Sequence, residues 1–197
     1  MAAYLQSADL AAFDVPNATA GQIQQASLLI DAFLQRPEGL IYTVDGSGNP
    51  LAMENTGAPI LQSFRMSPRG RNLIALNRPN VQAVLSVQYA QNGYGVPVWQ
   101  QVAAFQFQAG AGLYIPLDLS GYAVQVQFVA GWLYTALPVA IKQACANIVT
   151  AASGVFQGIN GNVQSVKAGD AQVTRFKDTV LDADTRALLQ PYQVVML

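Results

Sequence analysis

The chain of 197 residues is predicted to have an α+β fold. Apolar residues recur at three- and four-residue steps in two separate segments, 20–35 and 137–157, as they do in amphipathic helices. Between these segments the apolar period changes to two, which is typical of half-buried antiparallel strands. We therefore expect a helical N-terminal corner, an inserted antiparallel β-sheet subdomain, a long C-terminal helix and an extended C-terminal arm.

The N-terminal forty residues are predicted to form the helical corner. Ser7 is a good N-cap for a short helix at 8–13. Asn17 or Thr19 then caps a second helix at 20–35. Its apolar stripe consists of Ile23, Ala26, Ser27, Ile30, Phe33 and Leu34.

The long helix is predicted to begin near Pro138, because proline suits the first helical turn. Cys145 lies on its apolar face and is expected to be a buried small hydrophobe. That face consists of Leu137, Ile141, Ala144, Cys145, Ile148, Ala152, Val155 and Phe156. With one cysteine the chain forms no intrachain disulfide, which is compatible with a reducing cytoplasm.

The inserted region, 41–130, is predicted to hold short strands. The last strand alternates most cleanly, with Val124 and Val126 on one side and Gln125 and Gln127 on the other. The other candidates are 60–66, 72–76, 81–89, 101–108 and 113–117, with turns at Asn92-Gly93 and Gly110-Ala111-Gly112. The run 45–50 is interpreted as a hairpin turn rather than a calcium loop, since it lacks the distal glutamate.

The tail from 158 to 197 is predicted to be a docking arm, separate from an adaptor domain at 1–157. Short strands are expected at 163–166 and 172–176, around Ala168-Gly169-Asp170, and Asp182 caps a short helix at 183–190 that Pro191 ends. Its apolar residues are too few to form a core of their own, so we expect them to bind a partner: Leu181, Leu188, Leu189 and Tyr192.

Composition argues against several classes of function. The chain has no histidine, which removes Ser-His-Asp triads and most zinc sites, and no phosphate-binding glycine loop is present. Aspartates such as Asp118, Asp170, Asp178, Asp182 and Asp184 suit capping or solvated positions. We predict no enzyme, cofactor or metal site. No apolar run is long enough to span a membrane, and the N-terminus does not resemble a signal peptide.

Only 11% of the residues are charged, which suits a surface buried against other subunits. The net charge of −1 gives no general attraction to nucleic acid. One basic cluster, however, contains Arg65, Arg69, Arg71 and Arg78, with no acidic residue among them. In an oligomer these arginines could form a ring that attracts phosphates without reading sequence. The alternative is that they are solvated turn residues or form ion pairs between subunits.

Four motifs in this order resemble the head–tail connector (adaptor) proteins of long-tailed phages and phage-like particles. They are Tyr4-Leu5-x-x-x-Asp9-Leu10, then Ala26-Ser27-x-x-Ile30-Asp31-x-Phe33-Leu34-x-Arg36-Pro37-x-Gly39-Leu40, then Val126-x-Phe128-Val129-Ala130-Gly131-Trp132 with Leu137-Pro138, and finally Val166-x-x-Gly169-Asp170 with Leu188-Leu189-x-Pro191-Tyr192. Together they span nearly the whole chain. The β insertion departs from the smallest, nearly all-helical members of the family.

The resemblance implies a homo-oligomeric ring, usually of twelve subunits, bound beneath the portal protein. Such a ring extends the DNA channel, lies close to DNA without reading its sequence, and receives the stopper or tail-terminator protein. It implies a place in the virion neck after assembly in the host cytoplasm. The alternative is a β-rich virion accessory module that binds a carbohydrate or a host surface through aromatic residues such as Tyr94, Trp99 and Tyr114.

Overall fold

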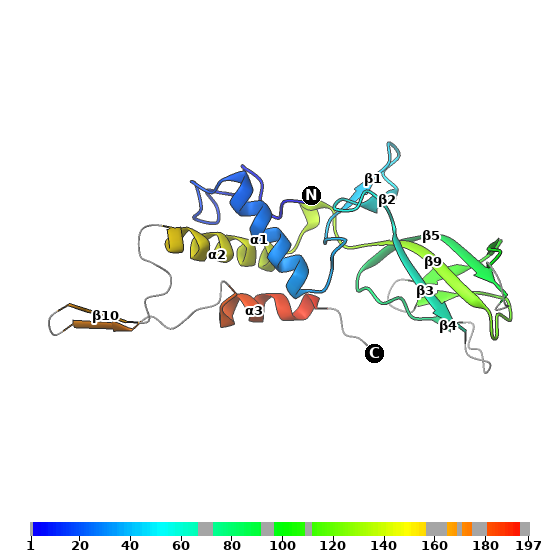
Figure 1. The fold of residues 1–197 in the computed structure, drawn as a ribbon. Helices are drawn as coiled ribbons and strands as arrows, with labels where there is room; N and C mark the ends of the chain where they lie inside the picture. Colours follow the sequence, from blue (N-terminus) through cyan, green and yellow to red (C-terminus); the bar gives the residue numbers. More distant parts are fainter. Residues whose placement is uncertain are drawn as a thin grey trace. The chain divides into compact units, whose positions relative to one another are not determined.

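The computed structural model describes residues 2–66, 73–91, 97–108, 112–156, 165–168, 171–174 and 181–193 (Figure 1). The chain divides into two compact units. A helical unit comprises Ala3–Gln35 and Leu137–Gln193, and a β unit comprises chiefly Arg36–Ala136. The β unit is thus inserted in the sequence between the two segments of the helical unit. Helices and antiparallel strands are both present, which confirms the predicted α+β class.

Helix α1 (Ala20–Phe33) begins where the sequence predicts. The Thr19 and Gln22 side chains each bind the other residue's backbone N–H, so two donors at the helix start are satisfied. Ile23, Ala26 and Ile30 are buried, as the predicted stripe requires. The helix ends because Gln35 adopts a left-handed conformation with φ of 56°.

The short helix predicted at 8–13 is wrong, because this segment forms turns. The Asp9 carboxylate accepts a hydrogen bond from the Gln6 backbone N–H (3.1 Å), so the side chain stabilises a turn instead of a helix start. The Val15 N–H bonds the Leu10 carbonyl (3.0 Å), and Asp14 has a φ of 57°. A single helical bond forms, from the Phe13 N–H to the Asp9 carbonyl (3.1 Å), and the helix does not propagate beyond it.

Helix α2 (Val139–Phe156) follows a single 3-10 turn, η1 (Tyr134–Ala136). It contacts both α1 and α3 (Ala183–Leu189), and η2 (Gln190–Tyr192) continues from α3. Residues of the predicted apolar face that are buried are Leu137, Ile141, Ala144, Cys145 and Ile148. Ala146 and Val149, outside that face, are buried as well, since α2 has a neighbour on more than one side.

The β unit contains nine strands among its described residues. β1 (Tyr42–Val44) and β2 (Pro50–Met53) form a hairpin by themselves. One sheet has the order β3-β9-β5-β6 and the other β4-β8-β7. The strands are β3 (Ile60–Arg65), β4 (Leu73–Ile74), β5 (Val81–Ala90), β6 (Gln100–Gln101), β7 (Gln106–Gln108), β8 (Gly112–Tyr114) and β9 (Ala123–Ala130).

The two larger sheets share one apolar core. Val87 and Phe128 from the first sheet and Ile74 and Leu113 from the second belong to the same buried cluster. The alternation predicted for β9 is confirmed, because Val124, Val126 and Phe128 are fully buried. The sequence therefore assigned the core face of the central strand correctly.

The strand predicted at 81–89 is present but irregular, and the strand predicted at 101–108 needs correction. Val84 breaks the alternation of β5 because the pairing with β9 shifts register between Val81 and Ala83 and again between Val84 and Ser86. The predicted strand 101–108 is divided between β6 and β7, which belong to different sheets. The predicted turn at Asn92-Gly93 and the first two residues of Gly110-Ala111-Gly112 lie outside the described residues.

Two further strands follow the helical segment of residues 137–156. β10 (Ser165–Ala168) pairs antiparallel with β11 (Ala171–Thr174), as predicted for the segments that flank Gly169-Asp170. Asp182 caps α3 by accepting from the Thr185 backbone N–H (2.7 Å), which confirms the predicted helix start.

Candidate functional site

Three segments of the β unit meet at Gly131 and Trp132. The Trp132 N–H donates to the Leu40 carbonyl (2.9 Å), and the Tyr42 N–H donates to the Trp132 carbonyl (3.1 Å). The Gly131 N–H donates to the Asn80 carbonyl (3.0 Å). We call residues 36–42, 77–82 and 130–132 the root. In the root, the chain entering the β unit and the chain leaving it lie side by side.

Only glycine fits at position 131 in the root. Its φ is 125°, a conformation that L side chains rarely adopt. A Cβ at this position would lie 2.2 Å from the Leu40 carbonyl oxygen, which is far inside van der Waals contact. Its own carbonyl accepts from the side-chain amides of Asn80 (2.7 Å) and Gln82 (3.0 Å). The backbone groups of this glycine are therefore bound from several directions.

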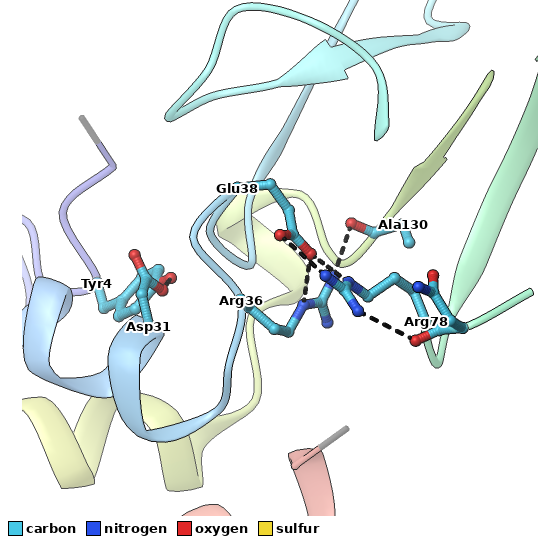
Figure 2. A network of polar contacts seen from close by, with 7 residues as sticks. Tyr4, Asp31, Arg36, Glu38, Arg78 and Ala130 are labelled. Carbon is cyan, nitrogen blue, oxygen red and sulfur yellow. Dashed lines mark hydrogen bonds and ion pairs between the residues drawn. The ribbon is translucent and has the colours of Figure 1, made fainter. Parts of the chain in front are cut away.

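A buried carboxylate lies between two arginines in the same root (Figure 2). The Arg78 Nε donates to Glu38 Oε1 at 2.5 Å, and Arg78 Nη2 donates to Oε2 at 3.3 Å. Arg36, which is fully buried, contacts Glu38 Oε1 through Nε at 3.4 Å. Its Nη2 donates to the Ala130 carbonyl at 3.3 Å. One acid and two bases thus join the same three segments as the backbone bonds.

The chemistry of the root is structural. Glu38 accepts hydrogen bonds from two guanidinium groups, those of Arg36 and Arg78. Nothing in the root resembles a nucleophile with an activating base. Among the described residues no group of three or more His, Cys, Asp or Glu could hold a metal ion.

Sequence reasoning found the Arg36-Pro37-x-Gly39-Leu40 and Ala130-Gly131-Trp132 motifs but missed Glu38 and the contacts that join the motifs. A charged pair two residues apart across Pro37 was the available signal. The partner Arg78 lies forty residues along the chain, so spacing alone does not reveal it.

Two residues of the predicted basic cluster, Arg65 and Arg78, lie among the described residues and have different surroundings. Arg65 is exposed at the end of β3, whereas the Arg78 side chain is only 14% exposed and pairs with Glu38 of its own chain. Arg69 and Arg71 lie outside the described residues. A channel or intersubunit role for the cluster stays a prediction, but Arg78 already has a structural function.

The predicted partner-binding residues lie on α3 and around it. Leu189 is fully buried within the chain, and α3 contacts α2. Leu181, Leu188 and Tyr192 are half-buried. Their binding to a portal or an adjacent subunit stays a prediction, and three of the four retain some exposed surface for it.

Cys145 is buried as predicted. Burial raises the pKa of its thiol to about 12, with a small opposing contribution from the Ser27 hydroxyl and a supporting one from the negative charge of Asp31. The thiolate that a nucleophilic cysteine needs is therefore absent at neutral pH. Asp31 is itself buried and accepts a hydrogen bond from the Tyr4 hydroxyl (Figure 2).

Three aspartates have structural roles. Several hydrogen bonds lower the pKa of Asp45, in the β1–β2 turn, and the bond from the backbone N–H of Asn49 has the largest effect. The Ser120 hydroxyl lowers the pKa of Asp118, and the Thr185 hydroxyl that of Asp182. The prediction that 45–50 forms a hairpin turn is confirmed, because Asp45 binds Ser47 and Asn49 of that turn.

Two of the aromatic residues considered for carbohydrate binding are described, and they adjoin different sheets. Tyr114 is 42% exposed on β8, and Trp99 is half-buried immediately before β6, which belongs to the other sheet. Tyr94 lies outside the described residues. Of the helices that the structure describes, none is long and apolar enough to cross a membrane.

Comparison with known proteins gave matches among solved structures alone; no protein-family model and no curated protein matches the chain. The chain is similar to chains in structures of gene transfer agent necks. A chain of the "neck of empty GTA particle computed with C6 symmetry" is 15% identical, with a TM-score of 0.51. The alignment covers 95% of this chain and 90% of that one. At this identity the likeness concerns the fold, which is shared over nearly the full length.

A chain of the "neck of native GTA particle computed with C12 symmetry" is 16% identical with a TM-score of 0.48, covering 97% of this chain and 91% of that one. A chain of the "virion of native gene transfer agent (GTA) particle" is 14% identical with a TM-score of 0.41, covering 90% and 79%.

Proposed function

We propose that this chain is a structural adaptor of the neck of a phage-like particle. In this proposal it forms a homo-oligomeric ring of about twelve copies beneath the portal protein. The ring extends the DNA channel and provides the attachment site for the stopper or tail-terminator protein. The observation that carries the proposal is the full-length likeness of the fold to a chain of a gene transfer agent neck.

The residues support a structural role. Several of the described charged groups are engaged in a cap, a turn or the root, and the thiol is buried and protonated. A surface poor in charge can be covered by neighbouring copies with little desolvation cost. Within the β unit, the root joins the entering and leaving segments through several hydrogen bonds.

In this proposal the arm at 158–197 contacts the portal or an adjacent subunit, and the adaptor domain at 1–157 forms the body of the ring. The contact is made by Leu181, Leu188 and Tyr192, which are half-buried. Leu189 is fully buried and packs within its own chain. Arg65, Arg69 and Arg71 are the candidates for the DNA path. Arg78 is excluded from that set because it neutralises Glu38.

Electron cryomicroscopy of the full chain, alone and mixed with portal-bearing heads, tests the proposal. We expect a closed ring bound at the portal vertex. A chain that stays monomeric and leaves the vertex bare would overturn it.

A variant with Arg65, Arg69 and Arg71 changed to Glu tests the DNA path. It should still form the ring, while the salt-sensitive binding of DNA is lost. The matched control changes the same three arginines to Lys, which keeps the positive charge that contact with phosphates needs. Wild-type DNA binding by the triple Glu variant would show that these arginines do not face DNA.

A further inference from the structure

The β10–β11 hairpin is smaller than a stable sheet. It consists of four residue pairs, from Ser165↔Thr174 to Ala168↔Ala171. In the part of the chain that the structure describes, no third strand pairs with it. An isolated two-stranded hairpin is marginally stable in water, since three or more strands or a covering layer are needed. The hairpin therefore requires further strands or a partner surface.

The register divides the hairpin into two unlike faces. Directly opposed residues share a face, and successive residues alternate between faces. By register, one alternate set is apolar in sequence and the other is polar: the first is Val166, Ala168, Ala171 and Val173, and the second is Ser165, Lys167, Gln172 and Thr174. A larger sheet with the same alternation can separate water from protein.

The two outer edges carry backbone groups that the hairpin does not use. Two residues connect the strands, so Ala168 and Ala171 form the closing pair that exchanges both hydrogen bonds. Because such pairs alternate, Val166 and Val173 exchange the next two bonds. The N–H and C=O groups of Lys167 on β10 and Gln172 on β11 are then directed outward, where only another strand matches them.

We propose that hairpins of successive copies pair edge to edge, β11 of one copy with β10 of the next, and close into an antiparallel β-barrel. This inference rests on the proposed ring. A cyclic symmetry axis preserves the direction of each strand along it, so every junction between copies is antiparallel. Both edges of every hairpin are then satisfied. A strand from an unrelated protein, or two-fold pairing of two copies, would leave one edge of each hairpin open.

The size of such a barrel suits a passage for DNA. A ring of about twelve hairpins brings about 24 strands together, and barrels of about 16–18 strands already leave an aqueous channel. The face with Lys167 suits the wet interior, and the face with Val166 and Val173 suits the protein side. The barrel would place one lysine per copy beside the phosphates without reading their sequence.

Directional cross-linking tests the pairing. Lys167→Cys and Gln172→Cys are made separately in a full-length Cys145→Ala background, so that neither chain can form an intrachain bond. Opposed residues of a hydrogen-bonded antiparallel pair have Cα atoms about 5.5 Å apart, within the range of a disulfide. The variants are mixed in equal amounts, with and without portal-bearing heads, and oxidised. A short bismaleimide is used in parallel because it tolerates the stagger of strands in a barrel.

We expect covalent dimers in the mixture and none from either variant alone. Random mixing allows a bond at about a quarter of the junctions, and the product stops at dimers because each chain has one thiol. Dimers from Lys167→Cys alone would indicate two-fold pairing and overturn the barrel. A ring seen by electron cryomicroscopy with no cross-link overturns the barrel alone. Failure to form any ring overturns both the proposed function and the barrel.

Discussion

The helical unit and the root of the β unit are held together by different physical means. In the helical unit, small and aliphatic side chains of α2 are buried between neighbouring helices, and burial is non-directional. In the root, backbone hydrogen bonds and two buried ion pairs connect three segments, and one glycine has no room for a side chain. We therefore expect single substitutions to lower the free energy of unfolding moderately in the helical unit and strongly in the root.

The largest effect is expected for Gly131→Ala in the root. The new methyl group would overlap the Leu40 carbonyl, and the φ of 125° would be strained as well. We expect the free energy of unfolding to fall by more than about 4 kcal/mol, measured by urea denaturation.

The matched control for Gly131→Ala is Gly121→Ala. Gly121 also has a positive φ, 79°, but a Cβ there would meet no atom within 4 Å. Its cost should be about 1 kcal/mol, from backbone strain alone. Equal losses for the two variants would show that close packing in the root contributes nothing.

Glu38→Gln should have the second-largest effect. It leaves the guanidinium groups of Arg36 and Arg78 together without the carboxylate that neutralises them, and Arg36 is fully buried. We expect a loss of about 3 kcal/mol in the free energy of unfolding. Glu54→Gln, at an exposed position in the same unit, should change it by less than about 0.5 kcal/mol. Similar small losses for both would mean that the ion pairs do not stabilise the root.

Substitution of Cys145, in the helical unit, should lower the free energy of unfolding by an intermediate amount. Cys145→Ser should cost about 1–3 kcal/mol, because a hydroxyl at this buried position lacks full hydrogen bonding. Cys145→Ala should cost less, since it removes one atom from a core of small residues. Native thiol labelling should be much slower than that of an unfolded control. Labelling at the unfolded rate would place the thiol at the surface.

The same thiol gives a pH dependence. The pKa of the Cys145 thiol is raised from 9.0 to about 12 in the folded chain. The contribution of the protonated thiol to the stability of the fold is therefore fully present below pH 9. Above pH 9 the unfolded chain loses the proton while the folded chain keeps it, so stability falls as pH rises toward 12. The Cys145→Ala variant should lack this part of the decline. Parallel curves for the two proteins between pH 9 and 12 would contradict the raised pKa.

The smallest effect is expected at the start of α3. Asp182→Ala removes the acceptor for the Thr185 N–H and should cost about 1 kcal/mol. Hydrogen bonds lower the pKa of Asp182, so its contribution is present above about pH 4 and is lost as pH falls further. Asp184→Ala, in the same first turn without a capping role, should cost less than about 0.5 kcal/mol. A larger loss for Asp184→Ala would reverse the assignment of the cap.

The sequence by itself determined the features that depend on near neighbours. The capping of α1 by Thr19 and of α3 by Asp182, the alternation of β9 and the turn at Asp45 all follow from residues within a few positions. Each is stabilised by contacts along one helix turn or across one hairpin, so spacing is sufficient to predict it.

Only the tertiary structure decided which distant segments meet. Glu38 binds Arg78 forty residues away, and Gly131 lies against the Leu40 carbonyl, although neither contact has a periodic signal. The bulges of β5 and the division of residues 101–108 between two sheets depend in the same way on the strands beside them. Such contacts are selected by the packing of the whole β unit, because a buried charge or a crowded glycine is tolerated only where a distant partner fits it.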